Sequence, residues 1–275
     1  MYGLHINSDP SLIHNNLVRY KNLKCIQLFI NINDKYKSEY ELLKNISMKH
    51  GQNIIVHLSY NINIAKNWNE HSWWITQCIL EIEKASDVGA KFAVLHLGKS
   101  LDMDMGTAIN NMYSSLLYIS GKVKNIDIKI LLETSSGQGS EMCLYIDELS
   151  NFMSKLIHNR NKYISDRFGI CIDTCHIFNA GYSLNTAKDV NNYLKEFDNK
   201  IGIKNIKLIH LNNSKTELGA GIDRHDNLEN GKIHMDGIRE IIRFAKKLNI
   251  PIILETPDIH IDDDIKFLNT FYKNL

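Results

Sequence analysis

Eight short apolar runs alternate with longer amphipathic stretches along the 275 residues, and this alternation predicts a (β/α)8 TIM barrel. Each run is continuously apolar, which is typical of parallel strands covered on both faces. Six of the runs also end on a histidine, aspartate or glutamate. The length suits one α/β barrel, so we expect a single domain over residues 1–275, with an open doubly wound sheet as the alternative.

The expected strands are the eight apolar runs, in chain order Tyr2–Ile6, Lys24–Ile30, Asn53–Ser59, Phe92–Gly98, Ile128–Thr134, Phe168–Asp173, Ile206–Asn212 and Ile250–Thr256. The helices that fit best between them are Lys37–His50, Asn67–Val88, Thr107–Val123, Met142–His158, Thr186–Asp198 and Gly237–Leu248. Asp236 is predicted to cap the last of these helices at its N-terminus, with Gly237 opening the first turn.

The third to eighth runs each place one ligand-capable side chain at the carboxyl end of the strand: His57, His96, Glu133, Asp173, His210 and Glu255. Barrel enzymes build their active sites from this end of several strands. Because side chains alternate along a strand, the residue two positions earlier also faces the barrel interior. These residues are Ile55, Val94, Leu131, Cys171, Leu208 and Ile253. All are apolar or small, as a filled layer beneath a site requires.

Six polar strand ends in succession are not explained by packing, because burying such groups without a partner costs several kcal/mol each. Metal ions are the simplest partner, and a mixture of histidine and carboxylate favours zinc or another divalent transition metal. Three further candidates, His176, Asp223 and His225, follow the sixth and seventh strands. Four carboxylates and five histidines are too many for one tetrahedral zinc and suit a cluster of two or three ions.

Other features of the sequence are weaker candidates for function. His5, at the end of the first strand, is expected to support the ligands without binding metal itself. Ser135–Ser140 is interpreted as a flexible Gly-rich loop that lacks the spacing of a phosphate-binding loop. The five cysteines are odd in number and scattered, so we interpret them as small buried residues in the reduced form.

Composition excludes several classes of partner and location. The formal net charge of +1 gives no global attraction to nucleic acid or to a membrane, so a polyanionic substrate must be held by local charge or bound metal. The first residues lack the basic and apolar regions of a secretory signal, and no run approaches the roughly 20 apolar residues of a membrane span. We expect an intracellular protein of the cytoplasm or nucleus, or of a virion if the chain is viral, without a membrane partner.

Four stretches carry motifs of a known family: His57-Leu-Ser-Tyr-Asn-Ile-Asn63, Glu133-Thr-Ser-Ser-Gly-Gln-Gly-Ser140, Gly169-Ile-Cys-Ile-Asp-Thr-Cys-His176, and His210-Leu-Asn-Asn-Ser with Asp223-Arg-His225. With the order and spacing of the nine candidate ligands, the chain resembles the endonuclease IV family of apurinic/apyrimidinic (AP) endonucleases over essentially its whole length. The resemblance implies a base-excision repair enzyme with three zinc ions. Such an enzyme cuts double-stranded DNA 5′ to an abasic site with a zinc-activated hydroxide. The products carry a 3′-hydroxyl and a 5′-deoxyribose phosphate. We expect it to act as a monomer.

The resemblance also implies which residues would share each metal, with Glu133 bridging two of them. It assigns His57, His96 and Glu133 to the first zinc, Glu133, Asp173, His210 and Glu255 to the second, and His176, Asp223 and His225 to the third. Glu133 and Glu255 would be the catalytic carboxylates, because they set the spacing of the metals and the surroundings of the hydroxide.

The resemblance extends to DNA contacts, with two departures from the family pattern. Tyr60 matches a tyrosine of a DNA-penetrating loop. The family tends to carry a duplex-entering arginine after the second strand, whereas Asn31–Tyr36 offers Asp34 and Lys35. We expect this segment and Tyr60 on the rim beside the metals, with Lys35 contacting a phosphate. Asn213 is the second departure, since an aspartate is common at that place.

Two other functions are compatible with parts of this pattern. A metal-dependent sugar isomerase of the xylose-isomerase-like barrels also carries Glu, Asp and His on strand ends. It needs one or two metals, which would leave His57, His96 and the Asp223-Arg-His225 group without a role. A zinc-dependent protein that binds damaged DNA without cutting it is the non-enzymatic alternative, and the full set of nine ligands argues against it.

Overall fold

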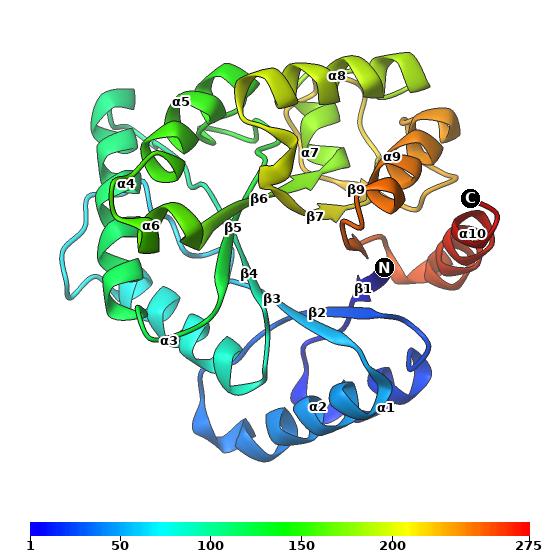
Figure 1. Cartoon of the computed structure of the whole chain (residues 1–275), viewed down its shortest axis with the longest axis horizontal. Helices are drawn as coiled ribbons and strands as arrows, with labels where there is room; N and C mark the ends of the chain where they lie inside the picture. The colour runs from blue at the N-terminus through cyan, green and yellow to red at the C-terminus, as the bar shows by residue number, and fades with distance from the viewer.

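The computed structural model describes residues 1–275, apart from the side chain of Pro10, and contains a closed barrel of eight parallel strands (Figure 1). The barrel strands are β1 (Tyr2–His5), β2 (Cys25–Phe29), β3 (Asn53–His57), β4 (Phe92–His96), β5 (Lys129–Glu133), β6 (Phe168–Asp173), β7 (Ile206–His210) and β10 (Ile252–Leu254). Their order around the barrel is β1-β10-β7-β6-β5-β4-β3-β2. The predicted (β/α)8 class is confirmed, and the open-sheet alternative is wrong.

Helices surround the barrel on its outer side (Figure 1). They are α1 (Ile13–Arg19), α2 (Lys37–His50), α3 (Trp73–Asp87), α4 (Met105–Lys122), α5 (Ile146–Ile157), α6 (Lys162–Arg167), α7 (Thr174–Asn179), α8 (Ala187–Lys200), α9 (Met235–Lys247) and α10 (Ile261–Lys273). Short 3-10 turns are η1 (Pro10–Leu12), η2 (Asp34–Tyr36), η3 (Ile203–Asn205) and η4 (Asp258–His260). A small antiparallel ribbon pairs β8 (Asn213–Ser214) with β9 (His225–Asp226). Across the described chain, no helix combines the length and the apolar character that a membrane span requires.

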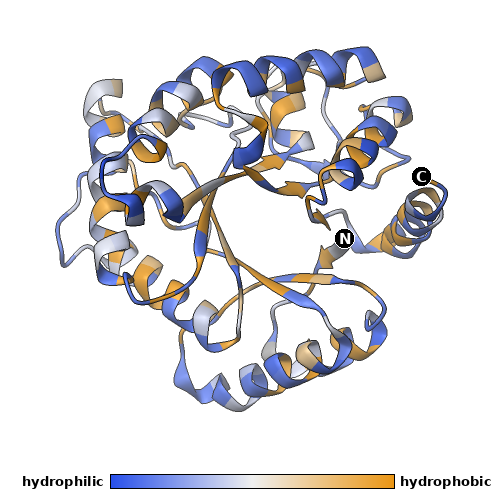
Figure 2. Ribbon diagram, viewed as in Figure 1, coloured by the Kyte–Doolittle hydropathy of each residue, from blue (hydrophilic) through white to orange (hydrophobic). Residues whose placement is uncertain are grey.

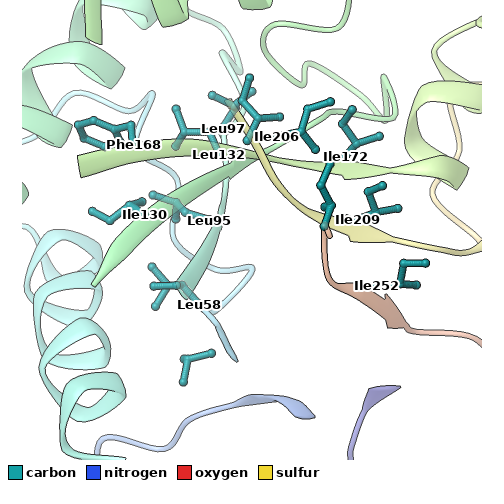
Figure 3. Packing of buried hydrophobic residues seen from close by; sticks show 14 of the residues in the cluster. Leu58, Leu95, Leu97, Ile130, Leu132, Phe168, Ile172, Ile206, Ile209 and Ile252 are labelled. Atoms are coloured by element: carbon teal, nitrogen blue, oxygen red, sulfur yellow. The ribbon is translucent and has the colours of Figure 1, made fainter. Parts of the chain in front are cut away.

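The main core lies between the barrel and the helices, because the strands and the inner helix faces are apolar while the outer helix faces are polar (Figure 2). Figure 3 shows the outward-facing strand side chains that fill this layer, among them Leu95, Ile130, Leu132 and Ile209, all buried. Each such side chain contributes roughly 1.5–3 kcal/mol by leaving water. This packing fixes the strands, so their carboxyl ends present a defined rim.

A second, smaller core fills the inside of the barrel. It consists of the six residues predicted for this layer, Ile55, Val94, Leu131, Cys171, Leu208 and Ile253, together with Cys25 of β2. The prediction of a filled interior is therefore confirmed. Gly3 of β1 pairs with Cys25, and a Cβ on Gly3 would lie 1.7 Å from the Cys25 carbonyl oxygen. Glycine is required there because β1 and β2 approach each other too closely for a side chain.

Three predicted helix starts are wrong, each for a local reason. The helix expected from Met142 begins at Ile146, because the Glu148 side chain accepts from the Leu144 and Tyr145 amides just ahead of it. The helix expected from Asn67 begins only at Trp73, because the Asn69 side chain accepts from the His71 amide and turns the chain before the helix. The N-cap of α9 is His234 and not Asp236. Asp236 lies instead in the first turn, where its charge favours the positive end of the helix dipole.

Candidate metal centre

The nine residues singled out from the sequence converge at the carboxyl end of the barrel. Seven of them line one pocket of about 380 Å³: His57, His96, Glu133, His176, Asp223, His225 and Glu255. The other two, Asp173 and His210, are fully buried and contact members of this set. Six of the nine lie at or directly after strand ends, while His176 lies in α7, Asp223 in the loop before β9 and His225 in β9. The sequence prediction therefore named residues that share one pocket.

Glu133 occupies the centre of this arrangement. Its Oε1 lies 2.7 Å from Nδ1 of His210, and its Oε2 lies 3.2 Å from Nε2 of His57 and 3.6 Å from Nδ1 of His96. Burial is the largest influence on the Glu133 pKa and raises it, but attraction by His210 and His96 outweighs burial and holds the pKa well below its ordinary value. A buried carboxylate with an oxygen toward each of two histidine groups is suited to bridge two cations.

Four of the histidines have one ring nitrogen held by an oxygen that can only accept. Nδ1 of His57 faces the Leu58 carbonyl at 2.8 Å, and Nδ1 of His176 faces the Thr134 carbonyl at 2.7 Å. Nδ1 of His225 faces the Glu255 carbonyl at 3.2 Å, and Nε2 of His210 faces Oε1 of Gln27 at 2.9 Å. These nitrogens must carry the proton, so in the neutral ring the opposite nitrogen presents a lone pair. Hydrogen bonds of this kind orient histidines that bind metals.

The lone pairs of His176 and His225 test whether the site fits a metal. Their Nε2 atoms are buried and make no hydrogen bond within the described chain. Nε2 of His176 lies 3.3 Å from Oδ2 of Asp223, and Nε2 of His225 lies 3.1 Å from Oδ1 of the same carboxylate. Lone pairs that face a carboxylate in a buried place repel it unless a proton or a metal cation lies between them. The donor set therefore fits a divalent metal ion.

The comparisons with known proteins agree with this geometry. The profile of a family described as a xylose isomerase-like TIM barrel matches residues 18–271. The "Probable endonuclease 4" of Staphylococcus carnosus (strain TM300) is 38% identical over 207 residues, which cover 74% of this chain and 67% of the relative. The chain belongs to the endonuclease IV family. The family is metal-dependent, and groups such as His57, His96 and Glu133 place their ligand atoms within 4.8 Å of one another.

Solved structures show the same fold at lower sequence identity. Endonuclease IV from Thermus thermophilus superposes with a TM-score of 0.76 at 20% identity, over 100% of this chain and 99% of that one. A D-tagatose 3-epimerase-like protein has a TM-score of 0.73 at 18% identity, over 99% and 97% of the two chains. At these identities the likeness shows the fold alone.

In this endonuclease IV member, the short helix α7 places two of the candidate ligands. Asp173 ends β6 and caps α7, with its Oδ1 accepting from the His176 amide at 2.9 Å. Its other oxygen accepts from Nδ2 of Asn212 at 2.6 Å and lies 3.6 Å from Nε2 of His225. Asp173 therefore serves as a helix cap and still offers one oxygen to the pocket.

Sequence reasoning missed two buried amide side chains that hold the ligands in place. Gln27 of β2 is fully buried, and its Nε2 donates to Oε1 of Glu255 at 2.6 Å while its Oε1 faces His210. Asn212 donates to Asp173 and to Oε2 of Glu255, at 2.6 and 3.2 Å. The sequence does contain an indication for Gln27. It is a polar residue inside the apolar run Cys25–Phe29, and it follows the inward-facing Cys25 by two positions, so its side chain also faces the barrel interior. His5, predicted as a supporting residue, lies 3.3 Å from Oε1 of Glu255.

Asn213, the second departure from the expected pattern, has a structural role in this chain. Its Nδ2 donates to the carbonyls of Leu228 and Ile233 at 2.7 and 2.9 Å. Its Oδ1 accepts from the amides of Ser214 and Ile233 at 2.7 and 2.8 Å. An aspartate cannot donate the first two bonds, so the amide suits the present conformation of this loop.

Two turns on the rim each carry an apolar side chain at the apex. The Ser59 hydroxyl accepts from the Asn61 amide at 3.3 Å, which leaves Tyr60 projecting with 72% of its surface exposed. Asn31 accepts from the amide of Asn33 at 3.0 Å, which places Ile32 at the apex of a similar turn. Tyr60, Asn31 and Ile32 line one pocket beside the metal pocket, and Tyr60 lines both.

Lys35 lies farther along the same segment, in η2. Its ammonium group lies 4.7 Å from the centre of the Tyr36 ring, and its side chain is exposed. The residues that line the metal pocket do not include it. A phosphate contact by Lys35 therefore stays a prediction for DNA outside the pocket.

The metal-free protein is expected to lose stability as the pH rises from about 6.5 towards 9. Burial lowers the pKa of His225, but attraction by Asp173, Asp223 and Glu255 outweighs it and raises the pKa to about 9. Because the folded pKa lies above the unfolded one, the stabilisation is complete below about pH 6.5 and disappears as the pH passes the folded pKa. Urea unfolding with chelator present, at several pH values, measures this. Stability that rises over the same window would contradict it, and His225→Gln should flatten the profile.

Proposed function

We propose that this chain is a zinc-dependent DNA repair endonuclease, acting as a monomer inside the cell, that hydrolyses the phosphodiester 5′ to an abasic site. The products are a 3′-hydroxyl and a 5′-deoxyribose phosphate. The observation that carries the proposal is the convergence of five histidines and four carboxylates at one pocket, beside an exposed tyrosine. Relatives named endonuclease 4 support the same function.

Three zinc ions match the size of this ligand set. The first would be held by His57, His96 and Glu133, the second by Glu133, Asp173, His210 and Glu255, and the third by His176, Asp223 and His225. When bound there, zinc supplies a strong nucleophile from water at neutral pH and neutralises charge on the entering and leaving oxygens. Neither Cys171 nor Cys175 lines the pocket: Cys171 belongs to the core inside the barrel, and Sγ of Cys175 accepts from Nδ2 of Asn179 at 3.3 Å.

The chain's own residues set the geometry for this chemistry. Glu133 directs one oxygen towards His57 and the other towards His210, so this carboxylate would bridge two metals and set their spacing. Glu255 is held by Gln27 and Asn212, which bind different oxygens of its carboxylate. These two neutral amides orient the carboxylate without removing its charge. Buried support of this kind keeps ligands in place before the substrate arrives.

The metals also explain how a nearly neutral chain attracts a phosphate. The formal net charge is +1, which provides no overall steering. Three zinc ions would bring six positive charges against four carboxylates and one hydroxide, which leaves roughly one positive charge in excess within the pocket. A phosphodiester would therefore be drawn to this pocket more strongly than to the remaining surface.

The proposal is tested with a duplex that carries one abasic site. We expect a single cut 5′ to that site, with a 3′ end that a DNA polymerase extends without further processing. A blocked 3′ end would indicate cleavage on the other side of the lesion. An uncut duplex, with isomerisation of free ketoses instead, would favour the sugar isomerase alternative. That alternative has support in the fold alone and leaves His57, His96 and the Asp223-Arg-His225 group without a role.

Replacing Tyr60 by alanine is expected to weaken binding to abasic duplex more than binding to undamaged duplex. The Tyr60 side chain is exposed at the apex of its turn, with its ring centre 6.1 Å from that of Phe29, so its ring is free to enter the space that a missing base leaves. Fluorescence anisotropy with both duplexes measures the difference. Equal losses for both would mean that Tyr60 only packs its loop.

A matched control is Tyr20→Ala. Tyr20 follows α1 in the connection to β2, at the amino end of the barrel strands. This replacement should leave both affinities unchanged. Ile32→Ala should behave as Tyr60→Ala does if the two rim turns act together on the duplex.

A further inference from the structure

The segment between β5 and α5 contacts several of the candidate ligands at once. The Thr134 carbonyl accepts from Nδ1 of His176 at 2.7 Å, and the Thr134 hydroxyl accepts from the Asp173 amide at 3.0 Å. Four residues later, Oε1 of Gln138 accepts from the Asp223 amide at 3.0 Å. The conformation of this one segment therefore helps to fix the positions of Asp173, His176 and Asp223.

Glu141 holds the segment in shape from its far end. Its Oε2 accepts from the amides of Ser136, Gly137 and Gln138, at 3.0, 3.0 and 3.1 Å, and from the Ser136 hydroxyl at 2.9 Å. Three successive amides that converge on one anion form a backbone nest. The other oxygen of Glu141 lies 3.5 Å from the ammonium of Lys99 in the segment after β4. The Gly-rich stretch interpreted from sequence as flexible is thus hydrogen-bonded around a carboxylate of the chain itself.

The nest brings Gln138 to Asp223 through close backbone packing. Gly137 has a φ of +87°, a conformation that glycine adopts most readily. Gly221, with a φ of +65°, lies against it, and a Cβ on Gly221 would lie 3.3 Å from the Gly137 carbonyl oxygen. The two loops therefore meet backbone to backbone, and the Gln138 side chain bridges to the Asp223 amide at this contact.

We propose that Glu141 is a positioning residue that acts through Gln138 to hold Asp223 between His176 and His225. Glu141 does not line the metal pocket, so its effect must pass through the loop. The Asp223 side chain is 34% exposed, whereas that of His176 is 4% exposed, so the aspartate is the member of this group that most needs outside support. The inference rests on the proposed metal role of Asp223.

The test measures zinc binding without DNA. Purified chain is stripped of metal, and zinc is returned in competition with a chelator of known affinity. We expect Gln138→Met, which keeps the length and removes the acceptor oxygen, to weaken the most weakly held zinc by roughly 10- to 100-fold. The two more tightly held zinc ions should bind as in the wild type. Glu141→Leu should give the same selective loss, and Glu141→Gln, which keeps one acceptor oxygen, should recover part of the affinity.

Two comparisons separate positioning from a general effect on folding. Because Glu141 is proposed to act on Asp223 only through Gln138, the double variant should bind zinc about as weakly as either single variant. Glu148→Gln is the matched control, since Glu148 also accepts from backbone amides, those of Leu144 and Tyr145, at the start of α5. It should leave zinc affinity unchanged. Thermal unfolding of the metal-free variants shows whether each is folded.

The outcomes are distinguishable. Wild-type affinity in Gln138→Met and Glu141→Leu would overturn the inference and leave the proposed function intact. Equal weakening of every zinc, together with a lower melting temperature, would also overturn it, because Glu141 would then only stabilise the fold. A wild-type chain that binds no zinc would overturn the proposed function instead.

Discussion

Replacing Glu133 by glutamine is expected to reduce the rate of incision at an abasic site by several orders of magnitude. The change keeps the size of the side chain and removes the charge that lies 2.7 Å from His210 and 3.2 Å from His57. A neutral amide is a weaker ligand and cannot accept in all the directions that a bridging carboxylate can. A thousandfold loss would correspond to about 4 kcal/mol of transition-state stabilisation.

Binding of abasic duplex should change little in the same variant, because the rim residues and the remaining metal charge still hold the DNA. Glu255→Gln should behave alike, since Glu255 lies 3.2 Å from Nδ1 of His210. Single-turnover incision and anisotropy with uncut duplex separate the two effects. Asp264→Asn is a control with a buried carboxylate outside the pocket lining, and it should cost stability without a comparable loss of rate. Near-normal turnover of Glu255→Gln with full metal content would contradict the mechanism.

Removing metal should abolish incision and destabilise the fold together. Four carboxylates, Glu133, Asp173, Asp223 and Glu255, meet at the pocket with histidine lone pairs among them. A ligand that binds only the folded chain, at a free concentration a thousand times its dissociation constant, raises the free energy of unfolding by about 4 kcal/mol. For a chain of this size, one such site shifts the melting temperature on the order of 10 °C.

Calorimetry and incision assays before and after chelation, and after zinc is returned, measure both effects. Full recovery of both with zinc is the expected result. Magnesium should not restore them, because a site rich in imidazole suits zinc better than a cation that prefers oxygen ligands. Unchanged stability after complete removal of metal would contradict the assignment of this pocket as a metal site.

The sequence predicted the barrel and the pocket well because both follow from patterns of neighbouring residues within each β/α unit. Each β/α unit repeats an apolar strand with one polar end, so Val94 and His96 indicate the inner layer and the rim from within a single run. The supporting residues could not be found that way. Gln27 acts on Glu255 across 228 positions of sequence, and its role depends on barrel closure, which brings β2 beside β1 and β1 beside β10.

Local reasoning also failed where side chains compete with helix formation or complete a loop. Asn69 delays α3 through a side-chain hydrogen bond that helical periodicity does not register. Glu141 lies one residue beyond the Gly-rich stretch Ser135–Ser140, so that stretch was interpreted without the carboxylate that folds it. In both cases the local structure depends on hydrogen bonds to one particular side chain. A pattern of residue types does not show whether such hydrogen bonds form.

The most direct test of the proposed zinc chemistry is a metal count on the purified chain, followed through reconstitution against incision of the abasic duplex. We predict three zinc ions per chain at full activity, with incision appearing only as the last of them binds. One or two metals per chain at full incision, or activity that persists after all metal is removed, would contradict this prediction.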